Sequence, residues 1–199
     1  MNTINLPGYI KHEYLLVIDI PEVLRTKIEK VREELVQAYR IKQPKTGRPH
    51  VGLVRFASLQ QQEEKIIECL QRLVMTRSPF IIEFSGFGSY PMHSIFIKIS
   101  TQEKIRQLVR LFKEARPLLK FNGDSPHFIE DPVVPLAARL DKDIYKAAML
   151  EYSGKHFSGR FVATSVLLLK RKDKYEKYHI ARRFELEQLQ VGIKQGELF

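Results

Sequence analysis

Short apolar runs of the strand type alternate with helix-type patterns along the 199-residue chain, and this alternation constrains the fold most strongly. Residues 14–18 form a continuous apolar run, which is typical of a strand that is covered on both faces. The apolar residues between Leu24 and Tyr39 then follow helical spacing. No low-complexity linker divides the chain, so the sequence predicts one α+β domain over residues 1–199.

The remaining strands and helices are predicted from the same two patterns, short apolar runs and helical spacing of apolar residues. We expect further strands at residues 50–56, 80–84, 94–99, 133–140, 161–169 and 178–186, and helices around residues 66–73, 105–112 and 144–152. The strand at 133–140 is compromised, because Pro135 has no N–H to donate to a sheet. The second half repeats the order of the first, which predicts two similar lobes.

Positive charge is the most informative feature of the composition. Lys and Arg number 33 against 23 Asp and Glu, which gives a formal net charge of +10. The surplus is concentrated in residues 155–183 and in a loop from Arg40 to Arg48 that contains no acid. This charge predicts an anionic partner, with nucleic acid or nucleotide first. The alternative is that the lysines and arginines only keep a hairpin tip and a loop soluble.

Several classes of protein are excluded. A single cysteine allows no intramolecular disulfide, and neither Cys nor His spacing suggests zinc, so we expect no metal and no cofactor. A phosphate-binding P-loop motif is absent. No apolar run approaches the roughly 20 residues that span a bilayer, and Met1–Gly8 lacks the layout of a signal peptide. These features predict a soluble, cytoplasmic protein without a membrane partner.

The segment from Arg48 to Phe56 carries the clearest chemistry. Residues two apart on a strand share a face, so we expect His50, Gly52 and Val54 to point one way. A histidine directly after a basic loop is well placed to meet an anion. We expect Arg48 and Arg55 to hold phosphate beside His50.

The residues Pro49-His50-Val51-Gly52-Leu53 resemble the Pro-His-x-Thr/Ser-Leu signature of the two-histidine phosphoesterase superfamily, which includes 2'-5' RNA ligases and cyclic phosphodiesterases. Residues 78–97 and 156–171 resemble that family's middle hairpin and final strands. The resemblance implies two lobes, each an antiparallel-rich sheet flanked by helices, around a central groove. It also implies metal-free chemistry on an RNA end or a small nucleotide, with one histidine as general base and the other as general acid.

The signatures are degenerate in this chain. The resemblance places the second one near residues 126–140, where Val133 stands at the histidine position and Pro135 at the threonine position. Gly52 stands where the first signature has Thr or Ser. His127 is the candidate substitute for the missing acid or base. Besides Arg48 and Arg55, the candidate substrate-binding positions are Gly52 and His93.

Three functions therefore stay open. The first is a phosphodiesterase or RNA-ligase-like enzyme that uses His50 and His127. The second is a non-catalytic module that binds RNA ends or nucleotides in the groove. The third is an interaction scaffold without a ligand. We expect His12, His156 and His179 to be structural or surface residues in all three.

Overall fold

Two antiparallel sheets form the framework of the computed structural model, which describes residues 10–41 and 47–188. Sheet A has the strand order β5-β2-β1-β8-β9, and sheet B has the order β6-β4-β3-β7. Every pairing within them is antiparallel. The strands are Lys11–Asp19 (β1), His50–Leu59 (β2), Phe80–Tyr90 (β3), Ser94–Ile99 (β4), His127–Phe128 (β5), Val133–Ala138 (β6), Ser158–Ala163 (β7), Ser165–Arg171 (β8) and His179–Glu185 (β9).

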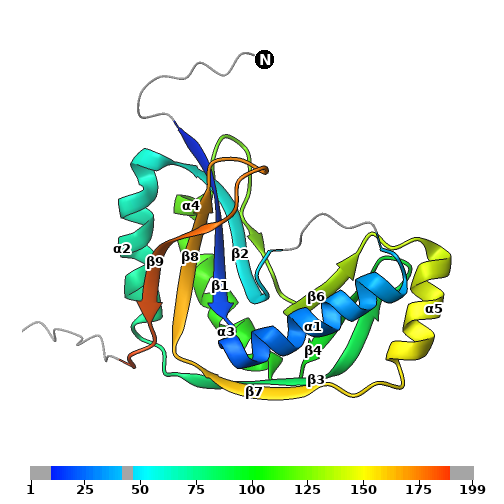
Figure 1. Ribbon diagram of the computed structural model, residues 1–199. Coiled ribbons are helices and arrows are strands. Elements are labelled where there is room, and N and C mark those ends of the chain that lie inside the picture. The colour runs from blue at the N-terminus through cyan, green and yellow to red at the C-terminus, as the bar shows by residue number, and fades with distance from the viewer. Residues whose placement is uncertain (1–9, 42–46, 189–199) are drawn as a thin grey trace, which may run out of the picture.

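Helices pack against both sheets, and one of them crosses between the lobes. The α-helices are Glu22–Ala38 (α1), Glu63–Val74 (α2), Gln102–Phe112 (α3), Arg116–Leu119 (α4) and Lys142–Tyr152 (α5), with short 3₁₀ turns at Gln60–Gln62 and Lys113–Ala115. Helices α2, α3 and α4 contact sheet A, whereas α1 and α5 contact sheet B. Helix α1 joins two strands of sheet A but lies along sheet B (Figure 1).

This arrangement confirms the predicted α+β architecture of two lobes, each built from a sheet and its helices. That residues 1–199 form a single domain stays a prediction. No helix within the described residues is both long enough and apolar enough to span a bilayer.

Strand β1 is buried on both faces, as its continuous apolar run predicts. Leu16 and Ile18 belong to the main core. Leu15 and Val17 point the other way and form a second apolar cluster with Leu167 of β8. Successive side chains of a strand alternate between its faces, so the run supplies both layers. The second layer lies on the face of sheet A that carries His50.

A β-bulge in β2 changes which side chains share that face. Two consecutive residues of β1 pair with Gly52 and Val54, which leaves Leu53 as an extra residue. The prediction that Val54 shares the face of His50 is therefore wrong, because Val54 is fully buried in the main core. Arg55, which is exposed, takes its place on the face that carries His50 and Gly52.

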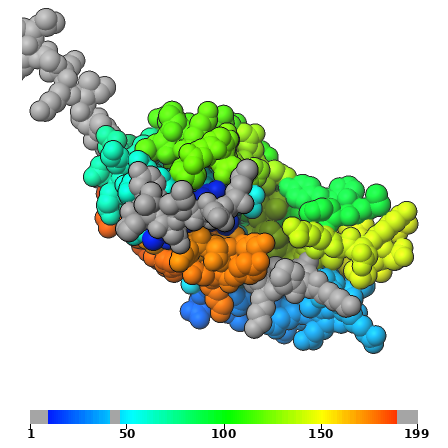
Figure 2. Space-filling view, turned by 90° about the horizontal axis from the view of Figure 1, so that it is seen from above, coloured from blue at the N-terminus to red at the C-terminus, as the bar shows by residue number. Residues whose placement is uncertain are grey.

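The lobes meet where β2 contacts β6, an edge strand of sheet B. Strand β5 pairs with Val54 and Arg55, so within the described residues the His50 end of β2 has no strand on that side. We call the surface bordered by His50 and Gly52 of β2 and by residues 133 and 135 of β6 the inter-sheet groove. Figure 2 looks down on the meeting of the lobes, where the surface dips between the orange β8–β9 hairpin and the yellow segment that contains α5.

Candidate functional site

His50 opens β2 and is held in one orientation by the backbone. Its Nδ1 atom lies 2.8 Å from the carbonyl oxygen of Arg48. A carbonyl can only accept a hydrogen bond, so Nδ1 carries the proton and Nε2 is left as an acceptor in the neutral ring. Burial lowers the pKa of His50, and the charge of Arg32 lowers it further, while the Arg48 carbonyl and Asp19 oppose the shift. His50 is therefore a neutral imidazole at pH 7.

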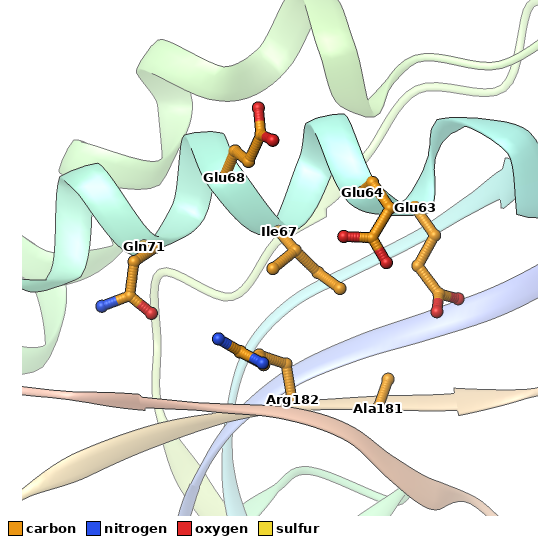
Figure 3. Close-up of a pocket in the computed structure, with 7 residues that line it drawn as sticks. All are labelled: Glu63, Glu64, Ile67, Glu68, Gln71, Ala181 and Arg182. Atoms are coloured by element: carbon orange, nitrogen blue, oxygen red, sulfur yellow. The ribbon is translucent and has the colours of Figure 1, made fainter.

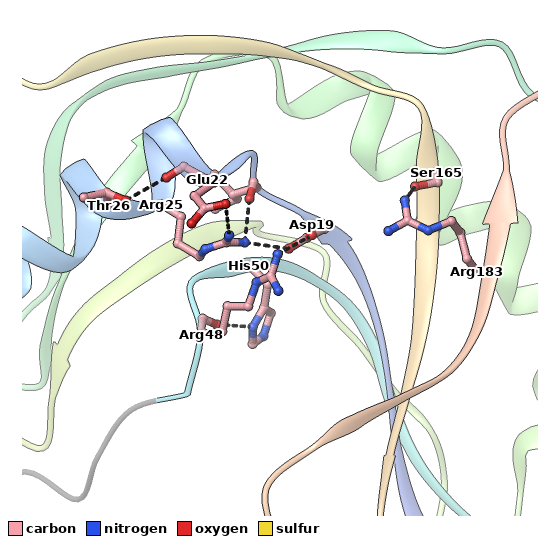
Figure 4. Close-up of polar contacts among 9 residues, drawn as sticks. Asp19, Glu22, Arg25, Thr26, Arg48, His50, Ser165 and Arg183 are labelled. Atoms are coloured by element: carbon pink, nitrogen blue, oxygen red, sulfur yellow. Dashed lines mark hydrogen bonds and ion pairs between the residues drawn. The ribbon is translucent and has the colours of Figure 1, made fainter.

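Arg48 lies at the site but is already paired. Its guanidinium is 2.6 Å from a carboxylate oxygen of Asp19, the residue of β1 that pairs with His50. Arg25 of α1 lies 3.6 Å from the other oxygen of Asp19 and donates a hydrogen bond to the carbonyl of Ile20. Figure 4 shows these side chains gathered around the start of β2. Arg48 remains 54% exposed, so its other N–H groups can still reach a ligand.

Arg32 of α1 is a site residue that the sequence analysis missed. It donates hydrogen bonds to the carbonyl of Gly47 at 3.1 Å and to that of Pro135 at 2.9 Å, so it ties the loop before His50 to β6. Its Nε atom is buried without a hydrogen-bond partner among the described residues. Burial lowers the pKa of Arg32, and none of the described carboxylates forms an ion pair with it. Within this part of the chain, an unpaired positive charge thus lies behind His50.

The β6 side of the groove is apolar. Val133 and Pro135 are two residues apart on β6, pair with Lys98 and Phe96 of β4, and share one face of the strand. Valine and proline side chains can neither transfer a proton nor donate a hydrogen bond. Across the groove from His50, β6 therefore offers no general acid at the two signature positions.

An apolar side chain also lies close to Gly52. A Cβ atom built on Gly52 would lie 2.7 Å from Cδ1 of Ile129. The backbone of Ile129 is held next to β2 by its N–H, which donates to the carbonyl of Leu53 at 2.8 Å. A side chain larger than glycine at position 52 would therefore require the Ile129 side chain to move.

His127 lies on the face of His50 but not beside it. It pairs with Arg55 across β5 and β2, and both side chains are exposed. On β1, the residues opposite His50 and Arg55 are four apart, Asp19 and Leu15. At about 3.3 Å per strand residue, that step is about 13 Å. The structure thus brings His127 together with Arg55 and separates both from His50.

His93 lies in the turn between β3 and β4. Its backbone N–H donates to Tyr90, and its carbonyl accepts a hydrogen bond from Leu140 just beyond β6. The strand register places it at the Ala138 end of β6, whereas Val133 lies at the other end. The exposed His93 side chain is therefore remote from His50 along the sheet.

Three of the nine Lys and Arg residues in residues 155–183 form ion pairs with glutamates. Lys170 contacts both carboxylate oxygens of Glu63, at 2.8 and 2.9 Å. Arg171 pairs with Glu13, and Lys155 pairs with the glutamate four residues before it. The basic hairpin contributes less free charge to the surface than its sequence suggests.

Two cavities formed by described residues lie outside the inter-sheet groove. The larger, of about 270 Å³, lies between α2 and β9 on the helix side of sheet A, where Figure 3 shows Arg182 of β9 opposite α2, with Glu68 pointing away from it. The smaller, of about 150 Å³, is lined by Asp19, Ser165 and Arg183 among others. Within residues 10–41 and 47–188, no cluster of His, Cys, Asp and Glu could hold a metal ion.

Comparison with known proteins gives one consistent result. Residues 20–174 match the family model described as the 2'-5' RNA ligase superfamily. The fold resembles that of Escherichia coli LigT in complex with 3'-AMP, with a TM-score of 0.64 and 15% identity over 88% of this chain and 98% of LigT. It also resembles LigT in complex with NADP+ (TM-score 0.58, 12% identity, 89% of this chain and 99% of that one).

A further solved relative is TT0787 of Thermus thermophilus, with a TM-score of 0.56 and 16% identity over 88% of this chain and 98% of that protein. No curated protein matches this sequence.

Proposed function

Because the chain belongs to the 2'-5' RNA ligase superfamily, we propose that its inter-sheet groove binds a nucleotide phosphate or an RNA end without cleaving it. One observation carries this proposal. Apart from His50, the positions at which the resemblance expects a histidine and two hydroxyls hold Val133, Pro135 and Gly52, and a Cβ on Gly52 would lie 2.7 Å from Cδ1 of Ile129. Loss of one proton-transfer partner costs about 10²–10⁴-fold in rate.

The groups that remain suit binding. The contact with the Arg48 carbonyl uses only Nδ1 of His50, and the spare N–H groups of Arg48 are the adjacent donors. The charge of Arg32, unpaired among the described residues, makes the site more positive, which favours an anion near His50. E. coli LigT, which has this fold, was solved with 3'-AMP and with phosphate, and ligands of that class are the first we propose for this chain.

The enzymatic alternative needs His127 to act with His50 on one phosphodiester. Side chains on one face of a sheet stand roughly parallel, so the two rings stay about as far apart as their backbones. Proton transfer requires a base within about 3 Å of the proton's heavy atom, directly or through one water. The register of β1, β2 and β5 weighs against that pairing.

A cytoplasmic location also stays a prediction.

We expect binding of a 2',3'-cyclic nucleotide to strengthen as the pH falls from 7.5 to 5.5. The cyclic phosphate does not titrate in this range, whereas His50 gains a proton on Nε2 and becomes a cationic donor. The pKa of free His50 is below its ordinary value, so the free protein is neutral at this position at pH 7.5. The gain in affinity is lost as the pH rises through the pKa of His50 in the complex. One hydrogen bond to a charged group, worth about 1.5 kcal/mol, corresponds to roughly tenfold in affinity.

Isothermal titration calorimetry across the pH series measures this effect. His50→Gln, which keeps an amide donor but does not titrate, should bind with nearly the same affinity at all pH values. An unchanged pH dependence in that variant would show that the anion does not contact His50.

A further inference from the structure

A second basic pair lies on the face of His50, farther along β2. Arg55 is directly opposite His127, and both side chains are exposed. Among the described residues, no ion pair involves Arg55. Opposite charges across two strands stabilise a sheet and like charges destabilise it. The pair of Arg55 and His127 contains no such opposite charges, and the side chains of both residues carry N–H donors suited to an anion.

The described surroundings leave the charge of Arg55 uncompensated. Tyr178 packs against the second apolar cluster. Burial raises the pKa of Tyr178, and the nearby charge of Arg55 opposes that rise. Glu13 also influences Tyr178, but its carboxylate is bound by Arg171, with 2.7 Å to the Nε atom. Because the carboxylate of Glu13 is bound by Arg171, it does not neutralise the charge of Arg55.

An apolar layer separates this pair from His50. Leu15 is opposite Arg55 on β1, and Val17 is opposite Gly52. Both belong to the second apolar cluster, and their side chains have no donors. The two candidate anion contacts are therefore about 13 Å apart along the strand. A single phosphate group is too small to contact both.

We propose that Arg55 and His127 form a second phosphate subsite, and that the natural ligand is the end of a short single-stranded oligonucleotide. The inference rests on the proposed function of the groove. One phosphate lies at His50, and another phosphate of the same strand accepts hydrogen bonds from Arg55 and His127. A guanidinium binds phosphate through two parallel N–H groups, which makes Arg55 the main contact. A nucleoside monophosphate reaches only one of the two points.

The experiment compares the affinities of 3'-AMP and of a 3'-phosphorylated trinucleotide by calorimetry at several salt concentrations. The wild-type protein should bind the trinucleotide at least tenfold more tightly. Arg55→Gln should remove most of that difference and should reduce the salt slope by about 0.7, the value for one phosphate contact on a single strand. Its affinity for 3'-AMP should stay unchanged.

Arg72→Gln is the matched control, because Arg72 is an exposed arginine on α2, on the other side of sheet A. It should behave as the wild type with both ligands. If 3'-AMP binds and the trinucleotide binds no more tightly, the second subsite is wrong and the proposed function stands. If the two arginine variants lose trinucleotide affinity equally, the contact is unspecific and the subsite is also wrong. If neither ligand binds to the wild type, the proposed function itself fails.

Discussion

Restoring the second histidine and both hydroxyls is expected to make the protein hydrolyse 2',3'-cyclic nucleotides at least about 100-fold faster than the wild type. The variant carries Val133→His, Pro135→Thr and Gly52→Thr. It also carries Ile129→Ala, because a Cβ at position 52 would lie 2.7 Å from Cδ1 of Ile129. Hydrolysis can be followed by chromatography of the nucleotide products.

The expected gain has a simple physical basis. Positions 133 and 135 share a face of β6, and Arg32 ties the carbonyl of Pro135 to the loop before His50. A histidine at 133 supplies the missing acid or base, and the threonines supply donors for the phosphate oxygens. Adding His50→Ala to the same variant is the control and should return the rate to that of the wild type. A folded variant that binds the nucleotide yet stays inactive would mean that more than these side chains has been lost.

Replacing Glu63 with glutamine is expected to lower the free energy of unfolding by about 3 kcal/mol, the upper end for hydrogen bonds to a charged group. The Glu63 carboxylate accepts hydrogen bonds from Tyr14 at 2.8 Å and from Lys170 at 2.8 and 2.9 Å. Only 15% of the Glu63 side chain and 21% of the Lys170 side chain are exposed. Without the carboxylate, the ammonium group stays largely buried and uncompensated. For a chain of this size the melting temperature should fall by about 6–12 °C.

The loss of stability in Glu63→Gln should depend on pH, because the Glu63 carboxylate titrates. Burial alone raises the pKa of Glu63, but the hydrogen bonds from Lys170 and Tyr14 outweigh it and lower the net pKa. Its contribution is therefore fully present above the ordinary value of about 4.3 and is lost as the pH falls below it. Urea unfolding at pH 7 and pH 3.5 should give a smaller difference between wild type and Glu63→Gln at the lower pH. Glu64→Gln, at an exposed neighbouring position, should unfold like the wild type at both.

The spacing of apolar residues predicted most helices and strands well, because those residues are buried in the core. The apolar run in β1 required cover on both faces, and the structure provides it through Leu16 on one side and Leu15 on the other. Alternation failed in β2, where a bulge exchanges Val54 for Arg55 on the groove face. The sequence held a signal for this bulge, since the two consecutive apolar residues at 53 and 54 break the alternation.

The site depends more on tertiary contacts, and the sequence revealed it less completely. Arg32 follows the buried Ile28 by four residues, so its place on the inner side of α1 was readable from spacing. The basic and acidic residues of this helix segment nearly balance, so its sequence did not single out Arg32 as a site residue. The contact of Ile129 with Gly52 could not be inferred, because it joins residues 77 positions apart through a loop.

The most direct test of the account is ³¹P NMR of an RNA trinucleotide ending in a 2',3'-cyclic phosphate, mixed with stoichiometric protein. We predict that the cyclic phosphate resonance shifts or broadens on binding and persists without conversion, and that this perturbation is reduced with His50→Ala. Conversion to a 2'- or 3'-monophosphate by the wild type, but not by His50→Ala, would contradict the account. It would show that His50 still catalyses cleavage despite Val133 and Pro135.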